Sequence, residues 1–189
     1  MRRMIQLRGA NACGKTTAVN QFIRLHDLQT DTLEYRGKNY ELQTDGRIYV
    51  IAKRRDDGTY GGLDGYVRNR DELVNVLIKV LKVKKPEILV FEGLVYGLTY
   101  KLGCQINEIA KSHGYHYTAV CLYLPLNEAL ERLYKRNGGK PINEETLTQK
   151  GLNGLRAYTK LSKSGIDTRL IDTADIPKDK MYKLIEDEI

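Results

Sequence analysis

Eight residues near the start of the chain, Gly9 to Thr16, have the types and spacing of a phosphate-binding loop. They read Gly-Ala-Asn-Ala-Cys-Gly-Lys-Thr and match G-x-x-x-x-G-K-[ST] at every fixed position. The glycines let such a backbone curl, so that successive N–H groups point at phosphate oxygens. In this pattern Lys15 reaches the β- and γ-phosphates, and the Thr16 hydroxyl is offered to Mg²⁺. The sequence therefore predicts a nucleotide site made of Gly9, Asn11, Ala12, Cys13, Gly14, Lys15, Thr16 and Thr17.

Carboxylates at two other places are candidates for catalysis. The apolar run 88–91 ends in Glu92, which a parallel sheet would place beside the loop, where it can help to hold Mg²⁺ or orient an acceptor. Asp64 follows Tyr-Gly-Gly-Leu and is the first choice for a base that takes a hydroxyl proton, because its small neighbours let a substrate approach. Asp56 and Asp57 are the alternatives for this base. All three aspartates equally suit turns.

Two arginines one helical turn apart, Arg132 and Arg136, are candidates for contact with a transferred phosphoryl group. Its transfer places negative charge on the equatorial oxygens, which cations must offset. Arg132 has Glu128 four residues before it and can form a surface ion pair with it. Arg136 has only Arg132 at that spacing, so we expect it to be the freer of the two. The stretch 137–150 begins Asn-Gly-Gly-Lys-Pro and is predicted to act as a lid.

A nucleotide site alone does not define a reaction. The guanine-reading stretch Asn-Lys-x-Asp is absent from the sequence, which argues against a GTPase. Motor ATPases usually have an apolar strand that ends in aspartate, whereas here the strand ends in Glu92-Gly93. These features favour a kinase and leave open an NTPase coupled to nucleic-acid binding. A redox role for the Cys13 thiol also stays open.

Length and composition favour one domain over residues 1–189. The hydrophobic fraction is 41% and the charged fraction 29%, and no apolar run reaches the roughly 18–20 residues of a membrane span. The three cysteines show no C-x-x-C spacing, which fits a reducing cytoplasm. The net charge is +7, and residues 132–163 hold eight basic residues against two acids. We therefore expect an anionic partner, either phosphates or nucleic acid, while the oligomeric state stays open.

Strands and helices alternate along the chain, which predicts an α/β fold with a mainly parallel sheet. A β-hairpin over 39–53, with Asp45-Gly46 as a type I′ turn, is predicted as an insertion into this pattern, followed by a loop over 54–66. Asn69 and Asn143 are expected to cap helices. The expected strands lie at 4–8, 87–92, 117–124 and 170–171, and the expected helices at 15–28, 69–85, 99–113, from 125, from 143 and at 177–188.

These motifs together resemble the P-loop kinase superfamily that includes nucleoside monophosphate kinases. They are the loop, the strand end Phe91-Glu92-Gly93 and the helix that carries Arg132 and Arg136. More narrowly, Gly61-Gly62-Leu63-Asp64 and residues 137–143 are similar to small phage-encoded kinases, some of which phosphorylate 5-hydroxymethyluracil in DNA. The resemblance implies a three-layer sandwich with a five-stranded sheet of order 2-3-1-4-5, ATP and Mg²⁺ as cofactors, and residues 172–174 near the adenine. It also implies the host cytoplasm as the location, if the chain is phage-encoded.

The hairpin over 39–53 departs from this resemblance, because monophosphate kinases carry a helical substrate-binding segment at that place. The departure leaves room for a large acceptor such as DNA. The expected function is transfer of the γ-phosphoryl group of ATP to a hydroxyl of a nucleotide-like acceptor, favoured as a modified base in DNA. A nucleoside or deoxynucleoside monophosphate kinase and a non-kinase NTPase are the alternatives. The expected catalytic residues are Lys15, Asp64, Glu92, Arg132 and Arg136, with Thr16 and Glu92 at the metal.

Overall fold

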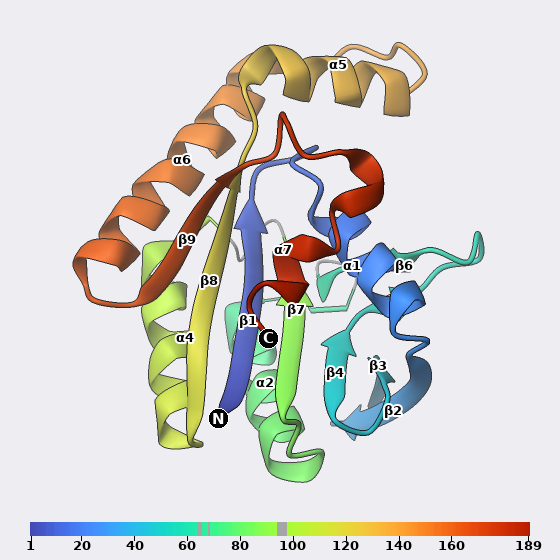
Figure 1. Cartoon of the computed structure of the whole chain (residues 1–189), viewed down its shortest axis with the longest axis vertical. Helices are drawn as coiled ribbons and strands as arrows, with labels where there is room; N and C mark the ends of the chain where they lie inside the picture. The colour runs from blue at the N-terminus through green and yellow to red at the C-terminus, as the bar shows by residue number, and fades with distance from the viewer. Residues whose placement is uncertain (64–65, 68, 94–97) are drawn as a thin grey trace.

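A seven-stranded sheet forms the centre of the molecule, and helices cover both of its faces (Figure 1). A computed structural model describes residues 1–63, 66–67, 69–93 and 98–189. A separate small sheet pairs β5 (Lys53–Arg54) with β6 (Tyr60–Gly61). The strands of the main sheet lie in the order β2 (Gln29–Tyr35), β3 (Lys38–Thr44), β4 (Ile48–Ile51), β7 (Ile88–Glu92), β1 (Arg2–Gly9), β8 (Tyr115–Tyr123) and β9 (Asp167–Asp172).

Two apolar layers hold the helices against the sheet. On one face α1 and α7 pack in one buried cluster, and on the other face α2, α4 and α6 pack in a second. Helix α5 lies beyond the carboxyl ends of the strands, where a smaller cluster joins it to the start of α6 (Figure 1). Within the described ranges, no helix combines the length and the apolarity needed to cross a bilayer. The helices are α1 (Lys15–Leu25), α2 (Arg70–Val83), α4 (Tyr100–Ser112), α5 (Leu126–Arg136), α6 (Glu144–Lys163), the 3₁₀ helix η2 (Lys178–Lys180) and α7 (Lys183–Glu186).

Five neighbouring strands, β4, β7, β1, β8 and β9, run parallel. If these five strands are numbered by their position in the chain, β1 is the first, β4 the second, β7 the third, β8 the fourth and β9 the fifth. Their order across the sheet is then 2-3-1-4-5. Strand β1 is buried without a break from Met4 to Gly9 because helices cover both faces, with Met4 in one cluster and Ile5 in the other, although Gln6 and Arg8 are polar. The parallel direction brings the carboxyl ends of β4, β7, β1 and β8 to one edge, which is where α/β proteins form their sites.

The main sheet has seven strands, so the predicted number of five was wrong. The hairpin over 39–53 exists as β3 and β4, but β4 also pairs in parallel with β7 and so belongs to the core rather than to an insertion. Strand β2 was not predicted. Only Leu33 of its seven residues is buried, so the sequence shows no alternation of apolar and polar residues there. The ion pair of Asp31 with Lys84, at 2.7 Å, joins this edge strand to the end of α2.

The tight turn was also assigned to the wrong place. A type I′ turn needs positive φ at both central residues. Between β2 and β3, Arg36 and Gly37 have φ of 52° and 70°. Between β3 and β4, Gly46 has positive φ and Asp45 does not; there the Asp45 carboxylate accepts hydrogen bonds from the backbone N–H groups of Arg47 and Ile48. The side chain of Asp45 thus holds a wider loop together.

Local helix signals were more reliable than strand signals. The side chains of Asn69 and Asn143 accept hydrogen bonds from the N–H groups of Glu72 and Thr146, which confirms both predicted caps. The predicted loop over 54–66 contains the short strand β6, and the expected helix over 177–188 is broken into η2 and α7. Helix α1 ends at Leu25, three residues earlier than predicted.

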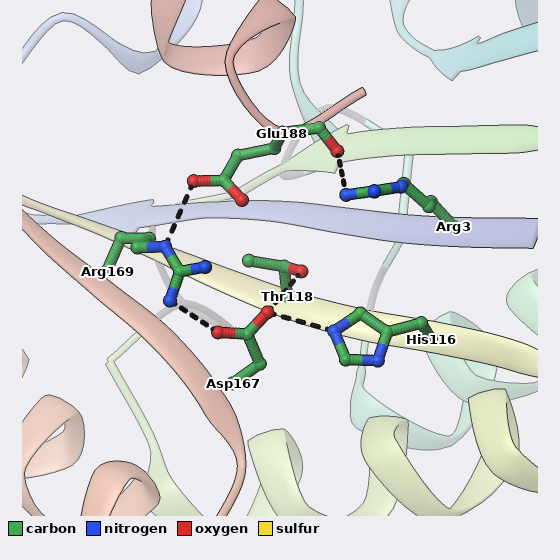
Figure 2. A network of polar contacts seen from close by, with 6 residues as sticks. All are labelled: Arg3, His116, Thr118, Asp167, Arg169 and Glu188. Carbon is green, nitrogen blue, oxygen red and sulfur yellow. Dashed lines mark hydrogen bonds and ion pairs between the residues drawn. The ribbon is translucent and has the colours of Figure 1, made fainter. Parts of the chain in front are cut away.

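A polar network joins β8, β9 and the carboxyl end of the chain (Figure 2). At its centre, Asp167 lies 2.9 Å from His116, 3.1 Å from Thr118 and 2.6 Å from Arg169. Arg169 lies in turn 3.5 Å from the carboxylate of Glu188. Burial alone would raise the pKa of Asp167, but the hydrogen bonds from His116 and Thr118 and the charge of Arg169 outweigh it. The pKa of this carboxyl therefore lies below its ordinary value of 3.8.

Asp167→Asn is expected to lower the free energy of unfolding by about 1 kcal/mol at pH 7, because a neutral amide replaces a partly exposed carboxylate among charged partners. A group whose pKa is lowered by folding stabilises the protein above its unfolded-state pKa. The difference in free energy of unfolding between the wild type and Asp167→Asn should therefore disappear as the pH falls through the lowered pKa of Asp167. Urea unfolding at pH 7 and pH 3 measures it, with the exposed Asp179→Asn as the control. An equal loss at both pH values would contradict an electrostatic origin.

Candidate active site

The turn between β1 and α1 has the backbone that a phosphate-binding loop requires. Gly9, Ala12 and Gly14 have φ of 139°, 66° and 90°, in the left-handed region that favours glycine. A Cβ atom on Gly9 would lie 2.5 Å from the carbonyl oxygen of Leu122, so no other residue fits there. Gly14 is the N-cap of α1, and the amino end of that helix therefore faces the loop. The loop predicted from the sequence is present as a strand-turn-helix unit.

Lys15 lies inside the loop. Its side chain is buried, and Nζ donates to the carbonyl oxygens of Gly9 at 2.9 Å and Ala10 at 2.8 Å. The Cys13 thiol is also buried and donates to the carbonyl oxygen of Ala10 at 2.9 Å. The loop thus holds an ammonium group close to its own backbone, in the place where the sequence pattern predicts phosphate binding.

Thr16 and Glu92 form the most direct link between the loop and the neighbouring strand. The register of β1 and β7 pairs Leu7 with Glu92, and the Thr16 hydroxyl donates to Oε1 of Glu92 at 2.9 Å. Oxygen ligands suit Mg²⁺, which is usually held by one or two carboxylates together with phosphates and water. Although the described residues contain no group of three or more acidic, histidine or cysteine ligands, this pair fits that mode of binding. The two residues predicted at the metal are therefore adjacent.

Hydrogen bonds of Asn20, on α1, hold Tyr60 and with it the glycine pair 61–62 next to the phosphate-binding loop. Nδ2 of Asn20 donates to the carbonyl oxygens of Thr16 at 2.7 Å and Tyr60 at 2.8 Å, and the N–H group of Tyr60 donates back to Asn20 at 2.7 Å. A Cβ atom on Gly62 would lie 2.3 Å from Oε1 of Glu92, so the backbone touches the carboxylate there. Sequence reasoning missed Asn20, because a polar residue on a helix carries no local sign of its distant partner.

A cavity of about 870 Å³ opens over the loop and is strongly basic. Among the described residues that line it, seven carry positive charge and only Glu92 carries negative charge. Lys53, in β5, and Arg55, directly after β5, line it, and sequence reasoning did not single them out. The signal available was a basic run, 53–55, soon after a buried strand. The seven cations are Lys15, Lys53, Arg55, Arg132, Lys135, Arg136 and Lys178.

The two predicted arginines both line this cavity but have different surroundings. Nη2 of Arg132 donates to the carbonyl oxygen of Thr173 at 3.0 Å and lies 3.7 Å from Glu128. Arg132 is therefore tied to the loop after β9 as well as to its own helix. In the described part of the chain, the side chain of Arg136 makes no hydrogen bond or ion pair. The difference predicted between the two arginines is present, with Thr173 as the nearer partner of Arg132.

The predicted base, Asp64, lies outside the described residues. Of its two alternatives, Asp57 is exposed and accepts hydrogen bonds from the hydroxyl and the backbone N–H of Thr59, which lower its pKa. These contacts are those of a turn-forming aspartate. Neither Asp56 nor Asp57 lines the cavity.

If the site transfers a phosphoryl group, as the sequence leads us to expect, Glu92→Gln should lower the rate of transfer by about 10²-fold, because an amide keeps the hydrogen bond from Thr16 but loses the charge that attracts Mg²⁺. The shape of the residue is kept, so the thermal midpoint should change little. Steady-state rates at increasing Mg²⁺ concentration measure the effect, and part of the loss should be recovered at high Mg²⁺. An unchanged Mg²⁺ dependence would show that Glu92 does not take part in metal binding.

Comparison with known proteins identifies the fold. The sequence matches no family model and no curated protein. Among solved structures, the chain is similar to the tunicamycin resistance protein of Deinococcus radiodurans, with a TM-score of 0.53 and 16% identity over 100% of this chain and 95% of that chain. It also matches a structure of the PezAT toxin–antitoxin system of Streptococcus pneumoniae, with a TM-score of 0.47 and 14% identity over 91% of this chain and 69% of that chain. The first likeness shows a shared α/β fold over the whole of this chain.

Proposed function

We propose that the protein is an ATP- and Mg²⁺-dependent kinase that phosphorylates a hydroxyl group of a nucleotide-like acceptor. The observation that carries this proposal is the basic cavity, which joins the phosphate-binding loop, the Thr16–Glu92 pair and Arg136 in one space. Phosphoryl transfer depends mainly on positioning and on charge, and these residues supply both. A hydrolase that only cleaves ATP has less need of two further cations in the cavity lining, Lys53 and Arg55.

The triphosphate would bind along the loop and the amino end of α1. Backbone N–H groups of the loop and the helix dipole favour its negative charge. Lys15 would exchange its loop carbonyls for oxygens of the β- and γ-phosphates. Thr16 and Glu92 would hold Mg²⁺, which when bound neutralises charge on the phosphate oxygens. Arg132, tied to Thr173, would border the nucleoside end of the same site.

The transfer step then needs an acceptor hydroxyl in line with the γ-phosphorus. The hydroxyl oxygen forms a bond to that phosphorus while the bond to the β–γ bridging oxygen breaks, and ADP leaves with the electron pair. The hydroxyl proton passes to a carboxylate and then to solvent, and Asp64 remains the predicted carboxylate. Arg136 would stabilise the charge on the equatorial oxygens during the transfer.

The excess of cations supports an acceptor that is itself anionic. Lys53 and Arg55 line the cavity together with Gly61 and Gly62, and both lie beside Gly61. We favour a hydroxymethylated pyrimidine in DNA as this acceptor, since the edge of the sheet carries β2 and β3 in place of a helical segment and the resemblance points the same way. A free nucleoside monophosphate is the alternative acceptor.

Salt dependence distinguishes the two acceptors. If DNA binds, the logarithm of the binding constant should fall against the logarithm of salt concentration with a slope of about −0.9 for each phosphate neutralised on duplex. Lys53→Ala and Arg55→Ala should each make this slope less negative by about one phosphate, while the exposed Lys111→Ala should not. Fluorescence anisotropy with hydroxymethyluracil duplex from about 50 to 300 mM salt measures it. Binding of the free monophosphate alone, without a salt slope, would contradict the DNA acceptor.

Asp64→Asn is expected to block transfer to either acceptor and to leave ATP binding unchanged, because the base acts on the hydroxyl and not on the phosphates. Single-turnover transfer and ATP binding, measured on the same preparation, test this assignment. Asp56→Asn is the matched control. Transfer at the wild-type rate in Asp64→Asn would remove Asp64 from the mechanism.

A further inference from the structure

The segment that follows β9 returns to lie beside α1 and lines the basic cavity (Figure 1). Ile176, Lys178 and Met181 are its residues in the cavity lining. Met181 is buried and lies against the N-cap of α1, because a Cβ atom on Gly14 would overlap the Cε atom of Met181. A nucleotide bound on the phosphate-binding loop would therefore have this segment as a neighbour.

The side chain of Gln21, on α1, holds this segment on both sides of Met181. Nε2 of Gln21 donates to the carbonyl oxygen of Lys178 at 2.5 Å, and Oε1 accepts from the backbone N–H group of Tyr182 at 3.1 Å. Gln21 is not among the described residues that line the cavity. The place of Lys178 and Met181 in the lining thus depends on a side chain outside it, which uses both ends of its amide for this purpose.

The preceding residue, Asn20, makes the same kind of contact with a different segment. Its amide donates to the carbonyl oxygen of Tyr60 and accepts from the N–H group of Tyr60, at 2.8 and 2.7 Å. Successive residues of an α-helix point about 100° apart, because 3.6 residues make one turn. The two neighbouring amides therefore reach two different segments of the cavity lining, 60–62 and 176–181.

The two segments bring different groups to the cavity. The backbone of Gly62 lies against the carboxylate of Glu92, and Asn20 also donates to the carbonyl oxygen of Thr16 at 2.7 Å. Asn20 thus connects the surroundings of both residues proposed for Mg²⁺. The segment 176–181 contains neither of those residues and contributes one cation and two apolar side chains. The hydrogen bonds of the two amides should therefore affect different parts of nucleotide binding.

We propose that Gln21 is a positioning residue for the nucleotide and that Asn20 is a positioning residue for its Mg²⁺. Without the bonds of Gln21, the segment that carries Lys178 can move away from the loop, and the nucleotide loses its contacts whether Mg²⁺ is present or not. Without the bonds of Asn20, the backbone against Glu92 is loosened, and Mg²⁺ should increase the affinity for the nucleotide less. This inference rests on the nucleotide site of the proposed function, which it deepens.

Titration calorimetry of a non-hydrolysable ATP analogue into the full chain separates the two roles without a transfer step, when it is done in excess Mg²⁺ and again in excess EDTA. Gln21→Met keeps the length of the side chain and removes both hydrogen bonds. It should weaken binding by about 5- to 10-fold, by the same factor in both solutions. Asn20→Leu keeps the shape of the side chain and should weaken binding by about 5- to 10-fold in Mg²⁺ but little in EDTA.

Gln29→Met is the matched control. Gln29 is an exposed glutamine on β2 whose amide donates to the carbonyl oxygen of Asp27, and it does not line the cavity. This variant should bind the analogue as the wild type does in both solutions. Thermal midpoints on the same samples show whether each variant is folded. Alanine takes the place of methionine or leucine at a position where the first variant does not fold.

Unchanged binding in Gln21→Met, or a loss that appears only with Mg²⁺, would overturn the role of Gln21. An unchanged effect of Mg²⁺ on the affinity of Asn20→Leu would overturn the role of Asn20, because a general disturbance of the site weakens binding equally in both solutions. Absence of saturable binding to the wild type would overturn both roles. The proposed function has a separate readout, since it fails when no acceptor is labelled from ATP, even where the nucleotide binds as expected.

Discussion

Lys15→Ala is expected to lower kcat for phosphoryl transfer by about 10²- to 10³-fold, the largest loss for any single residue of the loop. The reason is that Lys15 alone of the described loop residues brings a full positive charge to the phosphates. The loop carbonyls of Gly9 and Ala10 lose their donor in this variant, so its thermal midpoint must be measured beside the rate. Steady-state transfer of γ-phosphate gives the loss.

Lys140→Ala is the matched control for Lys15→Ala. It removes the same charge from an exposed residue that does not line the basic cavity. Its rate should stay close to that of the wild type. If Lys15→Ala keeps a near wild-type rate while remaining folded, the loop is not part of the catalytic site.

Arg136→Ala is expected to lower kcat by about 10³-fold, as loss of an arginine on the transferred phosphoryl group does in related chemistry. Arg132→Ala should have a smaller effect on kcat and raise KM for ATP, because Arg132 is held by Thr173 and Glu128 at the border of the cavity. The separation of kcat from KM distinguishes a residue that acts in the transition state from one that positions the nucleotide.

Lys135→Ala tests whether charge alone accounts for the effect of Arg136. Lys135 lies on the same helix, lines the same cavity and is paired with Glu131 at 2.6 Å. Its loss should change the rate only a few-fold, since an exposed ion pair contributes little. A larger loss of kcat in Arg132→Ala than in Arg136→Ala would mean that the roles of the two arginines are reversed.

The phosphate-binding loop could be predicted from the sequence because its chemistry is local. Positive φ at Gly9 and Gly14 and the proximity of Lys15 to the loop backbone follow from eight consecutive residues. The caps at Asn69 and Asn143 are equally local, since each side chain bonds a backbone N–H group three residues later. Glu92 was found because a buried parallel strand must end at the edge that carries the loop.

The rest of the site depends on contacts between residues distant in the sequence. Strand β2 is polar because it lies at the edge of the sheet, and β4 belongs to the core only through its parallel pairing with β7. Lys53 reaches the cavity because β4 ends there. Arg8 looked like the end of a strand, and its burial against Gln6 and Thr99 has no counterpart in the local pattern. Sequence reasoning therefore found the loop, Glu92 and the two arginines, and missed Asn20, Lys53 and Arg55.

The proposal that this protein is a kinase is tested most directly by transfer of radiolabelled γ-phosphate from ATP. The acceptors to compare are free nucleosides, nucleoside monophosphates, unmodified DNA and DNA that contains 5-hydroxymethyluracil. We expect label on a hydroxyl-bearing acceptor, most of all on the hydroxymethylated DNA, and loss of that label in Lys15→Ala and Arg136→Ala. Release of free phosphate alone, with hydrolysis stimulated by DNA and no acceptor labelled, would contradict it and identify a non-kinase NTPase.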